Sequence, residues 1–238
     1  GLSSAHATFI DEAEVPLFER AGWLIRLDRQ FHWDNDGYSS FDDFLASLAS
    51  RKRKAIRRER AEALKGLTVE RLTGDALTEA HWDAFWQFYQ DTGARKWGRP
   101  YLTRPFFSMI GERMADRLLL LLATRDGVAI AGALNLIGAD TLYGRYWGCT
   151  EEVPFLHFEL SYYQAIDYAI SHGLKRVEAG AQGEHKLSRG YRPVPTFSAH
   201  YLADPGLRDA VADFLEAERR AVANEIGYLG AFTPFKKG

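Results

Sequence analysis

Polar and ionisable side chains are concentrated in one predicted loop, EAGAQGEHKLSRGYRP, which covers residues 178–193. Amine acylation needs one group that accepts a proton from the attacking amine and another that stabilises the tetrahedral oxyanion. His185 or the carboxylate of Glu184 could do the first, and Lys186 or backbone N–H groups could do the second. The glycines would let a ligand approach the backbone closely. We therefore predict a catalytic set in this loop, with Tyr191 reaching back over it. The alternative is a solvated loop whose charges pair with one another.

Eight more residues are predicted to bind the substrates: Tyr143, Arg145, Trp147, His157, Glu178, Gln182, Arg95 and Lys96. The first three alternate along a predicted strand and would share one of its faces. There the guanidinium of Arg145 could bind a carboxylate or a phosphate. Glu178 and Gln182 would orient the acceptor, and the last two residues belong to a loop, TGARKWGRPYL, that could close over the site. The alternatives are a strand face that covers the core, a satisfied polar contact for His157, and an ordinary loop.

The order of the predicted elements indicates a mixed α/β fold. Helix signals mark residues 11–21, 40–66, 78–92 and 155–172 and stretches that begin at Thr103 and Pro205; strand signals mark residues 23–33, 67–74, 117–124, 128–137, 141–149, 174–181 and 197–203. Asp126-Gly127 predicts a tight hairpin. The strand–helix–strand spacing of residues 141–181 predicts a crossover between two parallel strands. We expect residues 1–33 to form an N-terminal segment and residues 34–238 to form one domain.

Composition limits the class of protein. The chain has 238 residues, a net charge of −2 and 46% hydrophobic residues, which suits a large domain with a sizeable core and argues against a general nucleic-acid coat. Its single cysteine, Cys149, allows no disulfide within the chain and indicates a reducing compartment. We find no signal peptide, no apolar run long enough to span a bilayer and no metal-binding motif, so we predict a cytoplasmic protein without a metal. Because the chain starts at Gly1 and not at Met, we expect a processed chain or a portion of a longer one.

A basic run, RKRKAIRRER, covers Arg51–Arg60 and holds seven lysines and arginines. Such a density could bind the phosphates of a tRNA or of an anionic lipid-linked precursor. The alternative is a solvated helix face on which Glu59 and Glu62 give partial pairing.

Three segments resemble the FemAB-like group of GNAT-fold proteins, which are associated with peptidoglycan biosynthesis or recognition: SRKRKAIRRERAEALKGLTVERL, RDGVAIAGALNLIGADTLYGRYWG and GLKRVEAGAQGEHKLSRGYRPVPTFSAHY. The resemblance covers residues 30–238 and is most specific at GAQGEHK. It implies a GNAT-like acyl-CoA N-acyltransferase fold for residues 34–238, in which two parallel strands separate and the acyl donor enters the gap. Fem-type enzymes carry two such domains and transfer an amino acid from aminoacyl-tRNA to an amine on a cell-wall precursor. The resemblance therefore also implies that an N-terminal half is missing.

One departure separates this chain from ordinary CoA-dependent GNAT enzymes. Those enzymes hold the CoA pyrophosphate with a (Q/R)-x-x-G-x-(G/A) loop at a helix N-terminus, where backbone N–H groups bind the phosphates. Here the same position reads CTEEVPFLHFE, which has no glycine pair, and Glu151 and Glu152 would repel a pyrophosphate. Fem-type enzymes lack that loop as well.

We therefore predict a transferase that moves an acyl or aminoacyl group onto an amine. The donor would be aminoacyl-tRNA or acyl-CoA, and the favoured acceptor is a cell-envelope or peptidoglycan precursor. One alternative is a CoA-dependent N-acetyltransferase with a non-standard CoA site. The other is a non-catalytic recognition module that binds cell-wall peptide or a polyanion.

Overall fold

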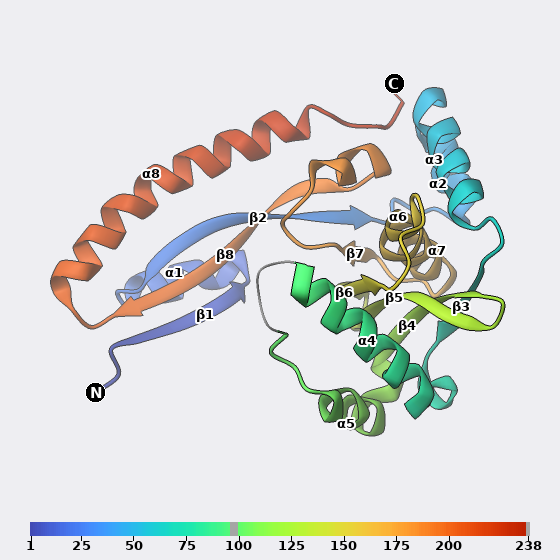
Figure 1. Ribbon diagram of the computed structural model, residues 1–238. Helices are drawn as coiled ribbons and strands as arrows, with labels where there is room; N and C mark the ends of the chain where they lie inside the picture. Colours follow the sequence, from blue (N-terminus) through green and yellow to red (C-terminus); the bar gives the residue numbers. More distant parts are fainter. Residues whose placement is uncertain (96–99, 237–238) are drawn as a thin grey trace. The chain divides into compact units, whose positions relative to one another are not determined.

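The computed structural model describes residues 1–95 and 100–236. The chain folds as two compact units (Figure 1). The first unit contains Gly1–His32 and Ala181–Thr233, and the second contains Trp33–Gly180 and the residues from Pro234 onward. The division into residues 1–33 and 34–238 stays a prediction.

The first unit is built on three antiparallel strands with β8 in the middle. β8 (Arg192–Leu202) pairs with β1 (Ser4–Ile10) on one side and with β2 (Leu24–Asp34) on the other, the last two residues of β2 lying in the second unit. A short helix, α1 (Val15–Arg20), connects β1 to β2, and the 26-residue α8 (Pro205–Gly230) follows β8. The side chain of Asp204 caps α8 by accepting a hydrogen bond from the Leu207 N–H at 2.7 Å, as its position before Pro205 predicts.

The second unit contains a five-stranded mixed arrangement in the order β7-β6-β5-β4-β3. Its strands are β3 (Thr68–Leu72), β4 (Leu118–Arg125), β5 (Val128–Ile137), β6 (Thr141–Cys149) and β7 (Arg176–Glu178). The pairs from β3 to β6 are antiparallel, whereas β6 and β7 are parallel. A continuous helical stretch joins this parallel pair: α6 (Leu156–Phe158), a π-helical turn (Glu159–Tyr163) and α7 (Gln164–Ser171). The predicted mixed α/β fold, hairpin and crossover are therefore confirmed.

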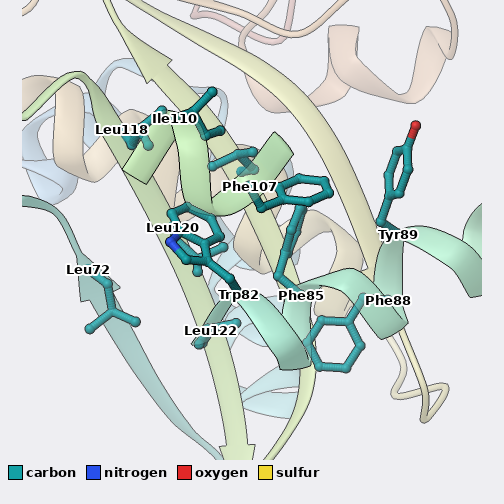
Figure 2. Close-up of a cluster of buried hydrophobic side chains, with 11 residues drawn as sticks. Leu72, Trp82, Phe85, Phe88, Tyr89, Phe107, Ile110, Leu118, Leu120 and Leu122 are labelled. Carbon is teal, nitrogen blue, oxygen red and sulfur yellow. The ribbon is translucent and has the colours of Figure 1, made fainter. Parts of the chain in front are cut away.

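Helix α4 (Glu79–Arg95) packs closely on this sheet together with α5 (Arg104–Met114) (Figure 2). Aromatic side chains of α4 lie in the core, because Trp82, Phe85 and Tyr89 are buried against the leucines of β4. Two glycines allow the close approach. Gly132 and Gly148 are paired on β5 and β6, and a Cβ atom on Gly148 would lie 2.1 Å from the carbonyl oxygen of Phe88.

Replacing Gly148 with alanine is expected to destabilise the fold by about 3 kcal/mol, because backbone atoms on both sides must move to admit the methyl group. The control is Gly227→Ala in α8, where nothing lies within 4 Å of the added methyl group. That change should stabilise the helix by about 0.5–1 kcal/mol. Urea unfolding of both variants measures the difference, and a Gly148→Ala protein as stable as the unmodified chain would contradict this packing.

The structure differs from the predicted elements in three places. The helix expected over residues 40–66 is two helices, α2 (Phe41–Ser47) and α3 (Ser50–Ala63), because the extended Leu48 between them pairs with Phe235. β1 was not predicted, since an edge strand with little buried surface lacks the alternating pattern of a half-buried strand. β8 begins at Arg192 rather than at residue 197. Its prolines lie where β8 pairs with β2 but not with β1, a position that tolerates proline.

Among residues 1–95 and 100–236, no helix is long and apolar enough to cross a membrane.

Candidate functional site

The loop predicted to be catalytic forms a short 3-10 helix over Glu184–Arg189, in the first unit. Gly183, at φ +96°, starts this turn, and Gly190, at φ +92°, ends it. Both angles favour glycine, which explains why glycines flank the polar residues. The turn carries the side chain of Lys186 to a buried position, 3% exposed.

The ammonium group of Lys186 lies over an aromatic ring that a second cation also faces. Nζ of Lys186 is 5.4 Å from the ring centroid of Phe31, and Cζ of Arg29 is 5.5 Å from the same centroid. Arg29 is held in place because it donates to the Ala181 carbonyl oxygen at 2.9 Å and to the carboxylate of Glu225. Burial, and to a lesser degree the nearby Arg29 guanidinium, lowers the pKa of Lys186 to about 8. The group can therefore exchange its proton near physiological pH.

His185 lies beside Lys186 and packs on the backbone of the turn. A Cβ atom on Gly183 would come within 2.3 Å of Cε1 of the imidazole, so only glycine leaves room for this ring position. Partial removal from water, followed by the charges of Arg189 and Lys186, lowers the pKa of His185. The imidazole is therefore mostly neutral at pH 7 and can accept a proton.

The remaining predicted residues of the loop have different environments. Tyr191 is buried, and its backbone N–H donates to the Lys186 carbonyl oxygen at 3.2 Å, so it supports the turn. Arg189, which was not predicted, is also buried and donates to the His185 carbonyl oxygen at 2.8 Å. Glu184 and Gln182 are exposed. Arg189 and Tyr191 thus fix the backbone that carries His185 and Lys186.

The second unit corrects the predicted face of β6. Leu134 pairs with Tyr146 and Asn135 pairs with Gly144, so Arg145 is the extra residue of a β-bulge. The bulge reverses the alternation along the strand. The prediction that one face of the strand carries Tyr143, Arg145 and Trp147 is therefore wrong. Tyr143 and Trp147 lie on opposite faces of the sheet.

The bulge places Arg145 beside two tyrosines that were not predicted as site residues. Its Nη2 donates to the hydroxyl oxygen of Tyr146 at 3.2 Å and to that of Tyr101 at 3.5 Å, and the two phenols share a hydrogen bond. Burial, together with the hydrogen bond shared with Tyr101, raises the pKa of Tyr146 to about 12, so its phenol stays neutral and can donate. An exposed guanidinium with two phenols is a suitable donor set for a carboxylate or a phosphate. We call these three residues the tyrosine–arginine set.

Trp147 and His157 meet on the other face of β6, at the start of the crossover helix. Their ring centroids are 5.1 Å apart, and the rings of Tyr162 and Phe158 lie 5.4 Å and 5.6 Å from that of His157. His157 is therefore part of an aromatic cluster rather than isolated in a gap. Both residues are partly buried.

Glu178 lies at the point where the parallel pairing ends. The ladder joins Thr141–Tyr143 to Arg176–Glu178, after which β6 continues to Cys149 while β7 stops. Burial raises the pKa of Glu178, although the nearby Arg176 opposes the shift. A carboxyl group with a raised pKa at a strand end is typical of a functional position.

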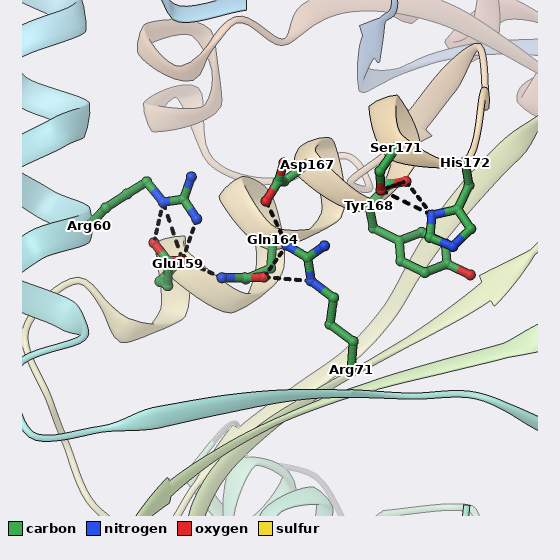
Figure 3. Close-up of polar contacts among 8 residues, drawn as sticks. All are labelled: Arg60, Arg71, Glu159, Gln164, Asp167, Tyr168, Ser171 and His172. Carbon is green, nitrogen blue, oxygen red and sulfur yellow. Dashed lines mark hydrogen bonds and ion pairs between the residues drawn. The ribbon is translucent and has the colours of Figure 1, made fainter. Parts of the chain in front are cut away.

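A buried ion-pair network anchors the basic helix α3 to the crossover helix (Figure 3). Glu159, in the π-helical turn, is 0% exposed and accepts hydrogen bonds from Arg60 Nε and Nη2 at 3.0 Å and from Gln164 at 2.7 Å. Gln164 in turn accepts from Arg71, which also pairs with Asp167. Glu159 therefore has a structural partner, and this part of the helix is fixed.

Most of the basic run remains exposed. Arg57 pairs with Asp42 and Arg60 with Glu159. Within residues 1–95 and 100–236, the five other cations of the run form no ion pair: Arg51, Lys52, Arg53, Lys54 and Arg58. They leave an uncompensated positive charge along the exposed face of α3.

Arg95 and Lys96 were predicted to belong to a loop that closes over the site. Arg95 is instead the last residue of α4, which is longer than predicted; Lys96 lies outside the described residues. In the part of the chain that is described, no three histidine, cysteine, aspartate or glutamate residues are grouped so that they could hold a metal ion.

Comparisons with known proteins give one family and one fold. The FemAB-like family, described as peptidoglycan biosynthesis/recognition, matches residues 1–237, a longer stretch than the resemblance predicted from sequence. No curated protein sequence matches the chain. Among solved structures, FemX is 14% identical, with a TM-score of 0.62 over 88% of this chain and 74% of the FemX chain.

Two further solved structures have the same fold. The C-terminal domain of an Agrobacterium fabrum protein assigned as a lysylphosphatidylglycerol synthetase has a TM-score of 0.61 at 12% identity, over 90% of this chain and 72% of that one. L-PGS from Bacillus licheniformis has a TM-score of 0.61 at 10% identity, over 90% and 73% of the two chains. At these identities the likeness shows the fold alone, and it confirms the predicted fold class.

Proposed function

Because the chain belongs to the FemAB-like family of peptidoglycan biosynthesis/recognition proteins, we propose that it transfers an acyl or aminoacyl group to an amine of a cell-wall precursor. The observation that carries the proposal is the buried Lys186 beside a histidine of lowered pKa. Together they supply the cation and the base that amine acylation needs.

The proposed reaction is a direct displacement. The amine nitrogen attacks the carbonyl carbon of the donor ester, and a C–N bond forms as the C–O bond of the ester breaks. The neutral imidazole of His185 accepts the proton lost by the nitrogen and returns it to the leaving oxygen. The ammonium of Lys186 stabilises the negative charge on the carbonyl oxygen during the attack. Glu184 remains a second proposed proton acceptor.

Two features of the second unit support an aminoacyl donor over CoA. The segment before α6 has no glycine pair, and Glu151 there is bound to Arg125. Phe155 starts the helix at φ +64°, a conformation that is rare for a residue with a side chain. Neither feature forms the phosphate cradle of a CoA loop. Since aminoacyl-tRNA is a cytoplasmic donor, the proposed reaction takes place in the cytoplasm.

We assign phosphate contact to the exposed cations of α3 and anion binding to the tyrosine–arginine set. The first would bind the tRNA backbone, whose charge makes binding salt-dependent. The second would bind a carboxylate or phosphate of the acceptor. The roles of Glu178, Gln182, Tyr143 and His157 in orienting substrates stay proposals.

A ligand panel tests the function. Transfer and thermal stability are measured with aminoacyl-tRNA, acetyl-CoA and a peptidoglycan precursor. We expect transfer only with aminoacyl-tRNA and precursor together, and a thermal shift with each of them alone. Lys54→Glu and Arg58→Glu should each weaken the tRNA shift, whereas Arg113→Glu, the same charge reversal on an exposed arginine of α5, should not. Turnover with acetyl-CoA would replace the proposal by a CoA-dependent acetyltransferase.

Binding without turnover would favour the second candidate, a recognition module. The tyrosine–arginine set favours this candidate, because it offers anion donors and needs no reacting group. In that case the precursor alone would raise the melting temperature, and no combination of donors would give a product.

The transfer rate is expected to depend on pH in a bell shape. The rate should rise as His185 loses its proton, and this limb should lie below the ordinary pKa of histidine because the pKa of His185 is lowered. The rate should fall as Lys186 loses its proton at about pH 8. A pH–rate profile measures both limbs. Lys186→Arg should remove the falling limb, since arginine stays charged over this range. A rate that keeps rising well above pH 8 would contradict the role of Lys186 as a cation.

A further inference from the structure

Helix α8 carries a seven-residue repeat on its exposed side. Leu207, Phe214, Ala221 and Tyr228 recur every seven residues, and Ala210, Ala217 and Asn224 follow the first three at a spacing of three. All seven are exposed, and the large ones are 55%, 61% and 67% exposed for Leu207, Phe214 and Tyr228. We call these seven residues the α8 seam. This a/d spacing is the pattern by which two helices pack as a coiled coil.

The opposite face of α8 is already fixed within the first unit, where the helix runs along β2 and β8 (Figure 1). Leu215 and Leu229 are buried there, and Arg26 pairs with Glu218 at 2.8 Å. Arg29 holds Glu225 two turns further on. The helix cannot rotate to bury the seam, which therefore stays available to a partner. The three large side chains of the seam, together with the exposed Phe232 just after the helix, form a larger apolar surface than scattered single residues would.

Charges beside the seam select the partner. Asp213 and Arg220 precede Phe214 and Ala221, at the positions that flank a coiled-coil seam. Within the described ranges 1–95 and 100–236, Asp213 forms no ion pair. Arg220 pairs only with Glu216, at 3.4 Å, and both are more than 70% exposed, so this bond contributes little. One acidic and one basic group thus remain for an interaction across the seam.

We infer that the α8 seam binds the seam of a second copy of this chain, with the two helices antiparallel. The proposed register is the one in which Asp213 of each copy faces Arg220 of the other. The same alignment packs each Phe214 over Ala217 of the second copy, so a large side chain meets a small one there, and it pairs each Ala221 with Ala210, where two small side chains let the helices approach closely. At each end of the pair, Leu207 of one copy packs against Asn224 of the other.

Other alignments bring like charges together. A parallel pair would place Asp213 opposite Glu218 of the second copy, a carboxylate already paired with Arg26 of its own chain, so Asp213 would face an acidic group and gain no cation. An antiparallel pair shifted by one heptad would place the two Arg220 side chains opposite each other. Since like charges across a seam destabilise a coiled coil, the proposed register is the one that these charges allow.

Sedimentation velocity over a wide range of protein concentration tests the pairing. We expect the full chain to dimerise and Phe214→Glu to remain monomeric with an unchanged circular dichroism spectrum. Asp213→Arg alone and Arg220→Asp alone should each weaken the dimer at least about tenfold, and the double variant should restore it. Asp209→Arg, the same charge change on α8 outside the seam, should have no effect.

Each other outcome overturns part of the inference. A chain that stays monomeric at every concentration excludes the dimer. A dimer that persists in Phe214→Glu excludes this surface. A double charge reversal that does not restore association excludes the antiparallel register. These outcomes are independent of transfer activity, because the seam lies outside the residues to which a reaction step is assigned.

Discussion

Replacing Lys186 with methionine is expected to lower the transfer rate about 100- to 1,000-fold, the usual loss when one oxyanion donor is removed from an active site. The fold should not suffer. Lys186 is 3% exposed, and burial lowers its pKa to about 8, so the folded protein holds this charge at a cost. Methionine has a similar length and no charge. We therefore expect a melting temperature equal to or higher than that of the unmodified protein, measured together with single-turnover transfer.

The matched control is Lys175→Met, which removes an ammonium group that is 79% exposed and lies in the other unit. It should change neither the transfer rate nor the melting temperature. A steep fall in the stability of Lys186→Met would show that the lysine has a structural role. A full transfer rate in that variant would remove Lys186 from the reaction.

Local patterns predicted the elements of the second unit well. The Asp-Gly turn and the run of leucines each act over a few residues, so the hairpin of β4 and β5 follows from sequence. The crossover also follows, because parallel neighbouring strands need a long connection and the helix between these two strands supplies it. The helix break at Leu48 does not follow, since its cause is pairing with Phe235, far away in the chain.

The candidate site could be predicted only in part. The polar turn is local, and its glycines and ionisable residues mark it in the sequence. The surroundings of Lys186 are not local. Arg29 and Phe31 reach it only because β2 pairs with β8, and the alternation of β2 does not show which loop its side chains will meet.

A single inserted residue explains the error on β6. Side-chain direction in a strand has a period of two, so one bulged residue moves every later side chain to the other face. The bulge at Arg145 therefore separates Tyr143 from Trp147 and brings Tyr146 to Tyr101 and Tyr89. Glycines near a strand end are compatible with a bulge, but they do not fix its position.

Replacing Arg60 with methionine is expected to be the most destabilising of the substitutions considered, at about 3–5 kcal/mol. Glu159 is fully buried, and Arg60 supplies its only cationic partner among the hydrogen bonds described for residues 1–95 and 100–236. Without the guanidinium, the amide of Gln164 is the one hydrogen-bond donor left to this buried carboxylate among the described residues. For a chain of this length the melting temperature should fall by roughly 6–20 °C.

Arg57→Met is the matched control, because it makes the same change three residues earlier on α3. Arg57 pairs with Asp42, but both side chains are more than half exposed, so its melting temperature should move by no more than about 2 °C. The double variant Arg60→Met with Glu159→Leu should recover most of the lost stability, since it removes the uncompensated charge and not only its partner. Equal losses for Arg57→Met and Arg60→Met would mean that burial of Glu159 does not govern the stability of this helix pair. An unrecovered double variant would mean that packing of Arg60 on the Phe41 ring, 4.3 Å from its Cζ, is the larger contribution.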